Sequence, residues 1–380
     1  MSDTIAGNPA LAPTNAIRLF LCGDVMTGRG IDQVLPHPCD PLLRESHMTS
    51  ALGYVELAER ANGLIPRRVP FSYVWGAALD ELDRAAPDLR IINLETSITR
   101  NDEFASKGIN YRMSPENVGC LLSANIDCCA LANNHVLDFG RAGLLDTLSI
   151  LAHARIAHAG AGRNFYEASA PAVFNISAKG RVAVFSFASG TSGVPLAWAA
   201  TPNDAGVKVL AALDEQAVDQ VADEIARATQ PNDIVVVSVH WGPNWGYEVP
   251  HEQRRFAHRL IDRASVAIVH GHSSHHAKAI EVYRGRLILY GCGDFISDYE
   301  GITGYEAFRG DLPVMYLAEV NPASRALSAL QIVPLKLRRF QLVRPTEADI
   351  EWMWRTLDRE CRRLGARVVL GTNGRLTLAW

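Results

Sequence analysis

The chain has 380 residues, of which 48% are hydrophobic and 21% charged, and its formal net charge is −4. These values are ordinary for a soluble globular protein with a large core. The net charge gives no reason to expect a nucleic-acid partner, which usually leaves a basic stripe, and no segment approaches the roughly 18 uninterrupted apolar residues of a membrane span. We therefore expect neither a nucleic-acid nor a membrane partner.

Residues 1–16 are polar and contain proline, and they lack the basic and apolar regions of a secretory signal. We expect a disordered leader and a cytoplasmic location. The rest of the chain is expected to form one catalytic domain over 17–335 and a C-terminal appendage of helix and strands over 336–380. The seven cysteines include no CxxC pair, which favours reduced thiols buried in the core.

Five short apolar runs, rich in β-branched residues, predict buried strands that each lead to a polar residue able to hold a metal. The runs are 18–22, 89–92, 126–132, 234–239 and 266–269, and they precede Asp24, Glu95, Asn134 with His135, His240, and His270 with His272. Helical patterns at 77–85, 140–153, 213–228 and 254–264 separate them. This alternation is typical of βαβ units, whose parallel strands end at one rim of a sheet. We expect the polar residues to converge there.

The most specific signal at this rim is a set of four histidines within residues 270–276. Burying imidazoles without partners is costly, so this cluster indicates a metal or catalytic site. Asp138 follows His135 by three residues and could orient its ring. Asp24 could instead cap a helix, Glu95 could be solvated, and Asp294 could either brace the rim or close a turn.

Imidazole, carboxylate and amide ligands without thiolate admit Zn²⁺, Mn²⁺, Fe²⁺ or Ca²⁺. We expect one or two divalent ions of unassigned identity. Aromatic and guanidinium side chains near the rim suit an aromatic substrate that bears a carboxylate or phosphate, although each aromatic could equally be core packing. The candidate substrate-binding residues are Arg29, Trp75, Arg112, Trp241, Trp245 and Tyr247.

Five ordered motifs over about residues 17–300 resemble the CapA (PGA_cap) family, which is linked to poly-γ-glutamate capsule synthesis. The motifs are GDVMTGRG, NLETSIT, LANNHVLDFG, VHWGPNWGYEVP and HGHSSHHAKAIE. The resemblance implies an α+β fold of the calcineurin-like metallophosphoesterase type. In that fold a four-layer β-sandwich with mixed sheets and flanking helices replaces the purely parallel sheet.

The resemblance also implies the roles of single residues. The positions that match the family's metal ligands are Asp24, Glu95, Asn134, His240, His272 and His275, and His135 matches an acid–base histidine. Two departures leave a single ion with water-mediated partners as an alternative to a two-metal site. Asp24 follows Cys22 and Gly23 where phosphatases begin an Asp-x-His pair, and Glu95 replaces an Asp.

A soluble branch of the family, found in lasso-peptide biosynthesis, resembles this chain most closely. It implies a metal-dependent peptide epimerase that inverts the α-carbon of a C-terminal tryptophan in a precursor peptide. His135 with Asp138 would serve one face, and a histidine of 270–276, such as His270 or His272, with Asp24 or Asp294 would serve the other. The alternatives are a metallophosphoesterase and a non-catalytic accessory protein of polyglutamate synthesis. The oligomeric state stays open.

Overall fold

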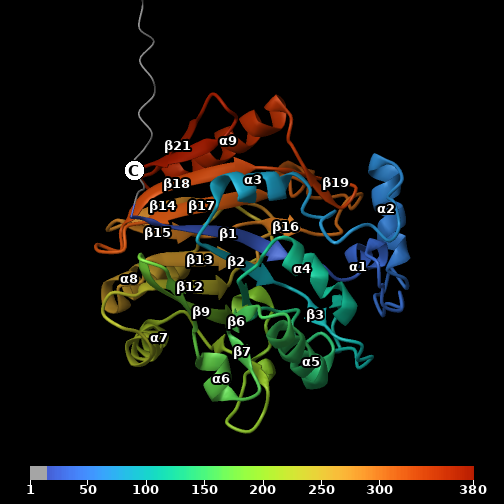
Figure 1. Cartoon of the computed structure of the whole chain (residues 1–380), viewed down its shortest axis with the longest axis horizontal. Helices are drawn as coiled ribbons and strands as arrows, with labels where there is room; N and C mark the ends of the chain where they lie inside the picture. Colours follow the sequence, from blue (N-terminus) through green and yellow to red (C-terminus); the bar gives the residue numbers. More distant parts are fainter. Residues whose placement is uncertain (1–14) are drawn as a thin grey trace, which may run out of the picture.

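The computed structural model describes residues 15–380, so the predicted leader lies almost wholly outside the described residues. Two mixed β-sheets face each other across the molecule (Figure 1). The first has nine strands among the described residues, in the order β21-β22-β18-β17-β1-β2-β5-β6, with β16 also paired to β1. These are β1 (Ile17–Val25), β2 (Leu89–Leu94), β5 (Cys128–Ala130), β6 (Ala157–Ala159), β16 (Asp294–Ile296), β17 (Val314–Val320), β18 (Leu327–Pro334), β21 (Arg367–Leu370) and β22 (Leu376–Ala379).

The second sheet has seven strands in the described part of the chain, in the order β11-β9-β12-β13-β15-β14, with β8 paired to β9. These are β8 (Ala172–Ile176), β9 (Gly180–Ser189), β11 (Val209–Leu210), β12 (Ile234–His240), β13 (Ile268–His272), β14 (Ile280–Tyr283) and β15 (Arg286–Leu289). Three short pairs lie apart: β3 (Ser97–Ile98) with β4 (Arg112–Met113), β7 (Ala161–Gly162) with β10 (Gly206–Val207), and β19 (Lys336–Arg338) with β20 (Gln341–Val343).

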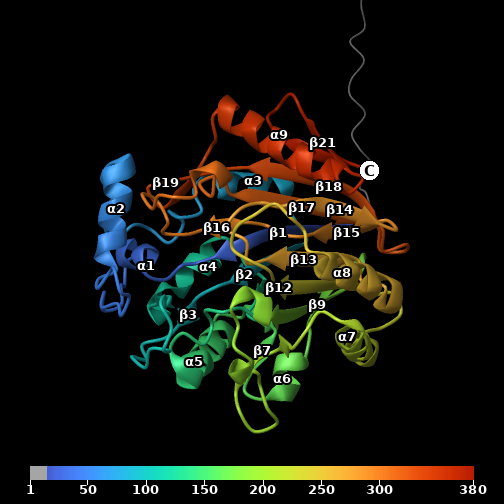
Figure 2. The same ribbon diagram turned by 180° about the vertical axis from the view of Figure 1, so that it is seen from behind.

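Side chains alternate between the two faces of each strand, and this alternation builds separate cores. On β1, Leu19 and Leu21 join the core between the sheets, whereas Phe20 and Cys22 join the core on the outer face of the first sheet. The outer core is covered by α3 (Ala77–Ala85), α4 (Gly119–Ser123) and α5 (Gly140–His153). The outer face of the second sheet packs on α7 (Glu215–Ala228) and α8 (His251–Ala264), as Figure 2 shows.

This order of helix, sheet, sheet and helix confirms the predicted mixed α+β sandwich. The purely parallel sheet that the strand pattern first suggested is wrong, because β17 runs antiparallel to β1 and β18 runs antiparallel to β17. All seven cysteines are buried and free, as predicted. Among the helices of residues 15–380, none combines the length and apolar character that crossing a bilayer requires.

Several predicted elements match the structure closely. The helices expected at 77–85 and 140–153 have those bounds, and α8 begins three residues before the expected 254. The stretch 30–75 contains α1 (Gly30–Val34) and α2 (Leu52–Asn62). A short helix α6 (Phe165–Ser169) precedes β8. In the C-terminal part, α9 (Glu347–Arg362) packs Met353 and Leu357 on the core between the sheets, and β22 pairs with β18.

The parallel strands bring distant residues to one edge of the sandwich. β1 and β2 run parallel, with Asp24 opposite Asn93, and β12 and β13 run parallel, with His240 opposite His272. Gly23 permits the close approach of β1 to the loop before β16, since a Cβ at this position would lie 1.7 Å from the carbonyl oxygen of Gly293. The same oxygen accepts the Asp24 N–H at 3.0 Å. The close contact therefore holds the backbone of Asp24 in place.

Replacing Gly23 with Ala is expected to destabilise the protein by about 1–3 kcal/mol, because backbone rather than a flexible side chain must move. Urea unfolding checks this, with Gly190→Ala as the matched control, since a Cβ at Gly190 would meet nothing within 4 Å. Equal unfolding midpoints for the two variants would contradict the close contact.

Candidate metal centre

Three buried side chains bring their donor atoms together at the ends of β1, β12 and β13. Asp24, His240 and His272 each offer one atom, and these atoms all lie within 4.8 Å of one another. The Nδ1 atoms of His240 and His272 are 2.8 Å apart, and His272 Nδ1 is 3.9 Å from Asp24 Oδ1. Two nitrogens and a carboxylate oxygen at this spacing match the donor set that divalent metals prefer in proteins.

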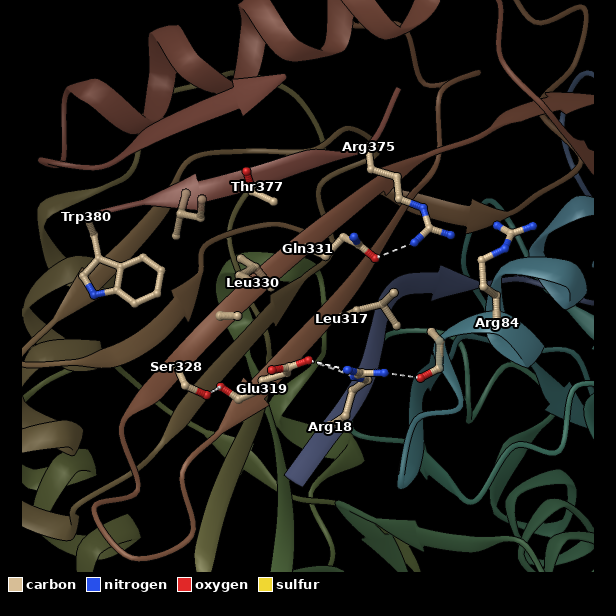
Figure 3. Close-up of a pocket in the computed structure, with 13 residues that line it drawn as sticks. Arg18, Arg84, Leu317, Glu319, Ser328, Leu330, Gln331, Arg375, Thr377 and Trp380 are labelled. Carbon is tan, nitrogen blue, oxygen red and sulfur yellow. Dashed lines mark hydrogen bonds and ion pairs between the residues drawn. The ribbon is translucent and has the colours of Figure 1, made fainter. Parts of the chain in front are cut away.

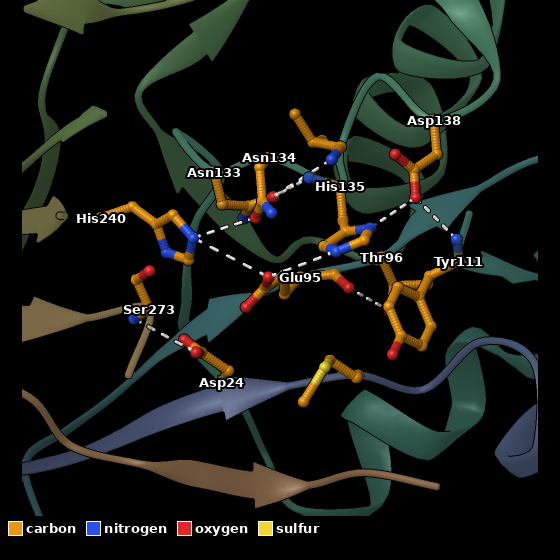
Figure 4. Close-up of polar contacts among 12 residues, drawn as sticks. Asp24, Glu95, Thr96, Tyr111, Asn133, Asn134, His135, Asp138, His240 and Ser273 are labelled. Atoms are coloured by element: carbon orange, nitrogen blue, oxygen red, sulfur yellow. Dashed lines mark hydrogen bonds and ion pairs between the residues drawn. The ribbon is translucent and has the colours of Figure 1, made fainter. Parts of the chain in front are cut away.

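Glu95 and Asn134 border the same centre on the Nε2 side of His240 (Figure 4). Glu95 Oε1 lies 3.8 Å from His240 Nε2, and Asn134 Oδ1 lies 3.0 Å from that nitrogen. The sixth predicted ligand, His275, places its Nδ1 2.8 Å from Oδ1 of Asp294, which is the register partner of Asp24 on β16. The structure therefore brings Asp24, His240 and His272 together, with Glu95 and Asn134 beside His240 and His275 beside Asp294.

Burial makes the negative charge of the carboxylates at this centre unfavourable, and a cation would stabilise that charge. Desolvation, together with the nearby Asp294 carboxylate, raises the pKa of Asp24 to about 7. Desolvation and Asp24 also raise the pKa of Glu95. Burial lowers the pKa of His240 and of His272, which keeps both imidazoles neutral and able to coordinate. Crowded acids beside neutral imidazoles fit a divalent metal ion.

Metal binding should depend on pH because the proton on Asp24 competes with the ion. Since the pKa of Asp24 is raised to about 7, the carboxylate is protonated below that pH. We expect the apparent affinity for Mn²⁺ to fall about tenfold for each pH unit below 7. Calorimetric titration on both sides of pH 7 measures this. A constant affinity across that range would contradict ligation by Asp24.

His135 stands beside the centre with its ring held by a carboxylate. Its Nδ1 lies 2.6 Å from Asp138 Oδ2, which also accepts the backbone N–H of Tyr111 at 2.6 Å. This contact places the proton of the neutral ring on Nδ1, so the unprotonated Nε2 faces Glu95 Oε1 at 3.7 Å. Burial lowers the pKa of His135 to about 4. The arrangement suits a base that accepts a proton at Nε2.

Lys107 is a residue of this site that sequence reasoning missed. Its Nζ pairs with Asp138 Oδ1 at 2.7 Å, lies 3.2 Å from His135 Nδ1 and donates to the carbonyl oxygen of Asn134. The ammonium therefore ties the turn that carries Asn134 and His135 to the loop before Tyr111. Lys107 lies in an irregular segment without strand or helix periodicity, so no sequence pattern marked it.

Two other predicted site residues have structural partners instead. His270, expected as a catalytic candidate, has Nε2 2.7 Å from the Cys22 carbonyl oxygen and Nδ1 3.1 Å from Ser238 Oγ. Both nitrogens are occupied by these contacts inside the sandwich. Arg29 pairs with Asp298 at 2.6 Å and with Glu45 at 3.0 Å, and its side chain is 1% exposed. It has no surface to offer a substrate.

The predicted aromatic pocket is only partly assembled. Trp75 and Trp241 are buried in the cores, where their Nε1 atoms donate to the carbonyl oxygens of Cys120 and Tyr290. Arg112 donates to the Asn101 carbonyl oxygen at 2.9 Å and pairs with Asp102. The substrate-binding role predicted for these three has no structural support.

Trp245 and Tyr247 do lie beside the centre. The ring of Trp245 is 5.2 Å from that of His275 and stacks on Tyr305 at 4.1 Å, while Tyr247 meets the edge of His276 at 4.6 Å. Tyr305 is half exposed. Together these rings form an aromatic wall next to His275, which suits the apolar part of a substrate.

A family model described as the bacterial capsule synthesis protein PGA_cap matches residues 18–299, a range that contains every candidate ligand. The chain belongs to this family. The PGA_cap match begins in β1 and ends just after β16, so four strands of the first sheet (β17, β18, β21 and β22) and α9 lie beyond it.

Two relatives show how far the similarity of this PGA_cap protein extends. A "probable polyglutamine synthesis accessory protein" of Mycobacterium tuberculosis is 48% identical over 96% of this chain and 95% of its own length. The "PGA biosynthesis protein CapA" of Bacillus subtilis is 27% identical over 88% of this chain and 79% of its own length. The first match covers 96% of the chain, so it extends well beyond the range of the family model.

Proposed function

We propose that this protein serves the synthesis of a glutamate polymer as a metal-dependent phosphoesterase. The observation that carries the proposal is the convergence of Asp24, His240 and His272, whose donor atoms lie within 4.8 Å of one another in a buried site. The names of its relatives, which refer to PGA biosynthesis and to an accessory protein of polymer synthesis, supply the biological setting.

The residues divide the work between holding an ion and moving a proton. Asp24, His240 and His272 would hold the ion, and Glu95 and Asn134 lie beside Nε2 of His240. A divalent ion at this place supplies Lewis-acid stabilisation of the charge that grows on a phosphoryl group. His135 accepts the proton of the attacking water at Nε2 and returns it to the leaving oxygen, while Asp138 keeps the ring oriented.

A generic phosphate ester tests the proposal. The purified protein with Mn²⁺ should hydrolyse p-nitrophenyl phosphate or its diester, and EDTA or His272→Ala should abolish turnover. The His153→Ala variant is the matched control, because His153 lies exposed at the end of α5. If wild-type protein with bound metal releases no phosphate product from either ester, phosphoester hydrolysis is excluded.

A second candidate function is peptide epimerisation, which the pairing of two histidines with carboxylates favours. His135 contacts Asp138, and His275 contacts Asp294 at 2.8 Å, so two braced imidazoles border one site. Inversion of a Cα centre uses a base on one face and an acid on the other. Incubation of a tryptophan-ended peptide in deuterium oxide tests it, since inversion places deuterium at Cα and yields a D-residue. The names of the relatives do not mention this chemistry.

A further inference from the structure

A cavity lies at the opposite end of β1 from the candidate metal centre. It has a volume of about 460 Å³ and opens on the outer face of the first sheet, past the C-terminal end of α3 (Figure 3). Arg18 stands near the start of β1 and Asp24 near its end, six residues further along. At about 3.3 Å per residue the two sites are roughly 20 Å apart.

Strand register explains why polar side chains gather on this face. Arg18 on β1 lies opposite Glu319 on β17, Leu317 lies opposite Gln331 on β18, and Gln331 lies opposite Thr377 on β22. Residues paired directly across neighbouring strands point to the same side of a sheet. The outer face therefore presents a row of hydrogen-bonding groups, with Trp380, 51% exposed, at its rim.

Positive charge exceeds negative charge in this cavity. Arg18 pairs with Glu319 at 2.5 Å, while Arg84 and Arg375 both pair with Glu81 at 2.5 Å. Three guanidinium groups thus share two carboxylates. Arg84 is 51% exposed and, among the described residues, contacts Glu81 only through Nη1. Its remaining N–H donors face solvent at the mouth of the cavity and can bind a carboxylate in a two-pronged contact.

We propose that this cavity is a second binding site for the acidic polymer, in which Arg84 and Arg375 bind the free carboxylates of a glutamate segment. The identity of the ligand rests on the proposed function, whereas the site itself rests on the cavity and its surplus guanidinium charge. Binding at two separated sites on one polymer would raise the overall affinity without new contacts at the metal centre.

The test measures binding without catalysis. A fluorescein-labelled glutamate decamer is titrated with the full-length protein in EDTA, and fluorescence anisotropy reports binding. Wild-type protein should bind in low salt and weaken as salt rises. Arg84→Glu should weaken binding about tenfold or more, and Arg375→Gln should also weaken it. The matched control is Arg355→Glu, which changes an exposed arginine of α9 outside the cavity and should bind as wild type does.

The outcomes distinguish binding in this cavity from binding elsewhere on the protein. Equal weakening by Arg84→Glu and Arg355→Glu would show that net charge alone attracts the polymer, and it would overturn the proposal. Absence of wild-type binding, or loss of binding only in Asp24→Asn, would overturn it as well. Turnover of a small phosphate ester should be unchanged in Arg84→Glu. If the wild-type protein does not hydrolyse the small ester, the proposed function is wrong, but the binding result remains valid.

Discussion

Replacing His135 with Asn is expected to lower phosphate-ester turnover by about 10²–10⁴-fold, which is the usual contribution of a positioned acid–base group. The metal content of the protein should not change, because His135 Nε2 faces Glu95 at 3.7 Å while the donors of Asp24, His240 and His272 cluster without it. Single-turnover rates and elemental analysis of the same preparation measure the two quantities.

The Asp138→Asn variant tests whether the orientation of the His135 ring matters for proton transfer, because it leaves His135 itself in place. This variant keeps the shape of the side chain but weakens the contact that fixes the ring at 2.6 Å. We expect reduced turnover and an unchanged content of metal. If His135→Asn retains turnover within a few-fold of the wild type, His135 is not the base, and the proton must be accepted elsewhere in the site.

Replacing His240 with Ala is expected to weaken binding of Mn²⁺ or Zn²⁺ by more than about 100-fold. Removing a group that only supports a ligand costs 10–100-fold in affinity, and a direct ligand should cost more. His240 carries a nitrogen of the donor cluster, and its ring also contacts Asn134. Because a bound ion stabilises only the folded state, metal at about 100 times its Kd should add about 2.7 kcal/mol to wild-type stability and almost nothing to the variant.

The matched control for this variant is His258→Ala. His258 lies on α8, where its Nε2 contacts Glu281 at 3.0 Å, outside the candidate centre. Thermal melts of both variants with and without metal give the comparison. An equal metal-induced rise in melting temperature for His240→Ala and wild type would show that the ion binds at another place.

The convergence of the candidate ligands could be predicted from the sequence because the pattern of apolar residues marks where each strand ends. Apolar β-branched runs end abruptly before Asp24, His240 and His272, and parallel strands carry such ends to one edge. The direction of the C-terminal strands was harder to predict. The runs that form β17 and β18 look like any other strand, and only pairing with β1 sets their antiparallel direction.

His270 shows what spacing cannot reveal. His270 and His272 are two residues apart on β13, so both point to the same face, and Ser238 Oγ lies 3.1 Å from one and 2.8 Å from the other. The difference is depth along the strand. His270 lies two residues further from the end of β13, where its Nε2 contacts the Cys22 carbonyl oxygen. Only the packing of β1 against β13 gives His270 this partner, so the sequence spacing does not reveal it.

For Trp241, by contrast, the sequence itself argues against a substrate-binding role. It directly follows His240 at the end of β12, and adjacent residues on a strand face opposite ways. With His240 facing the centre, Trp241 packs against Phe256 of α8 on the far side. Arg29 had no such signal, because its partner Asp298 is 269 residues away in the chain.

The most direct test of the metal centre is anomalous diffraction from crystals soaked in Mn²⁺ or Zn²⁺. We predict a peak about 2.0–2.3 Å from a carboxylate oxygen of Asp24 and from a ring nitrogen of each of His240 and His272. The peak should vanish in crystals of His240→Ala. A peak at other side chains, or none at saturating metal, would contradict the account.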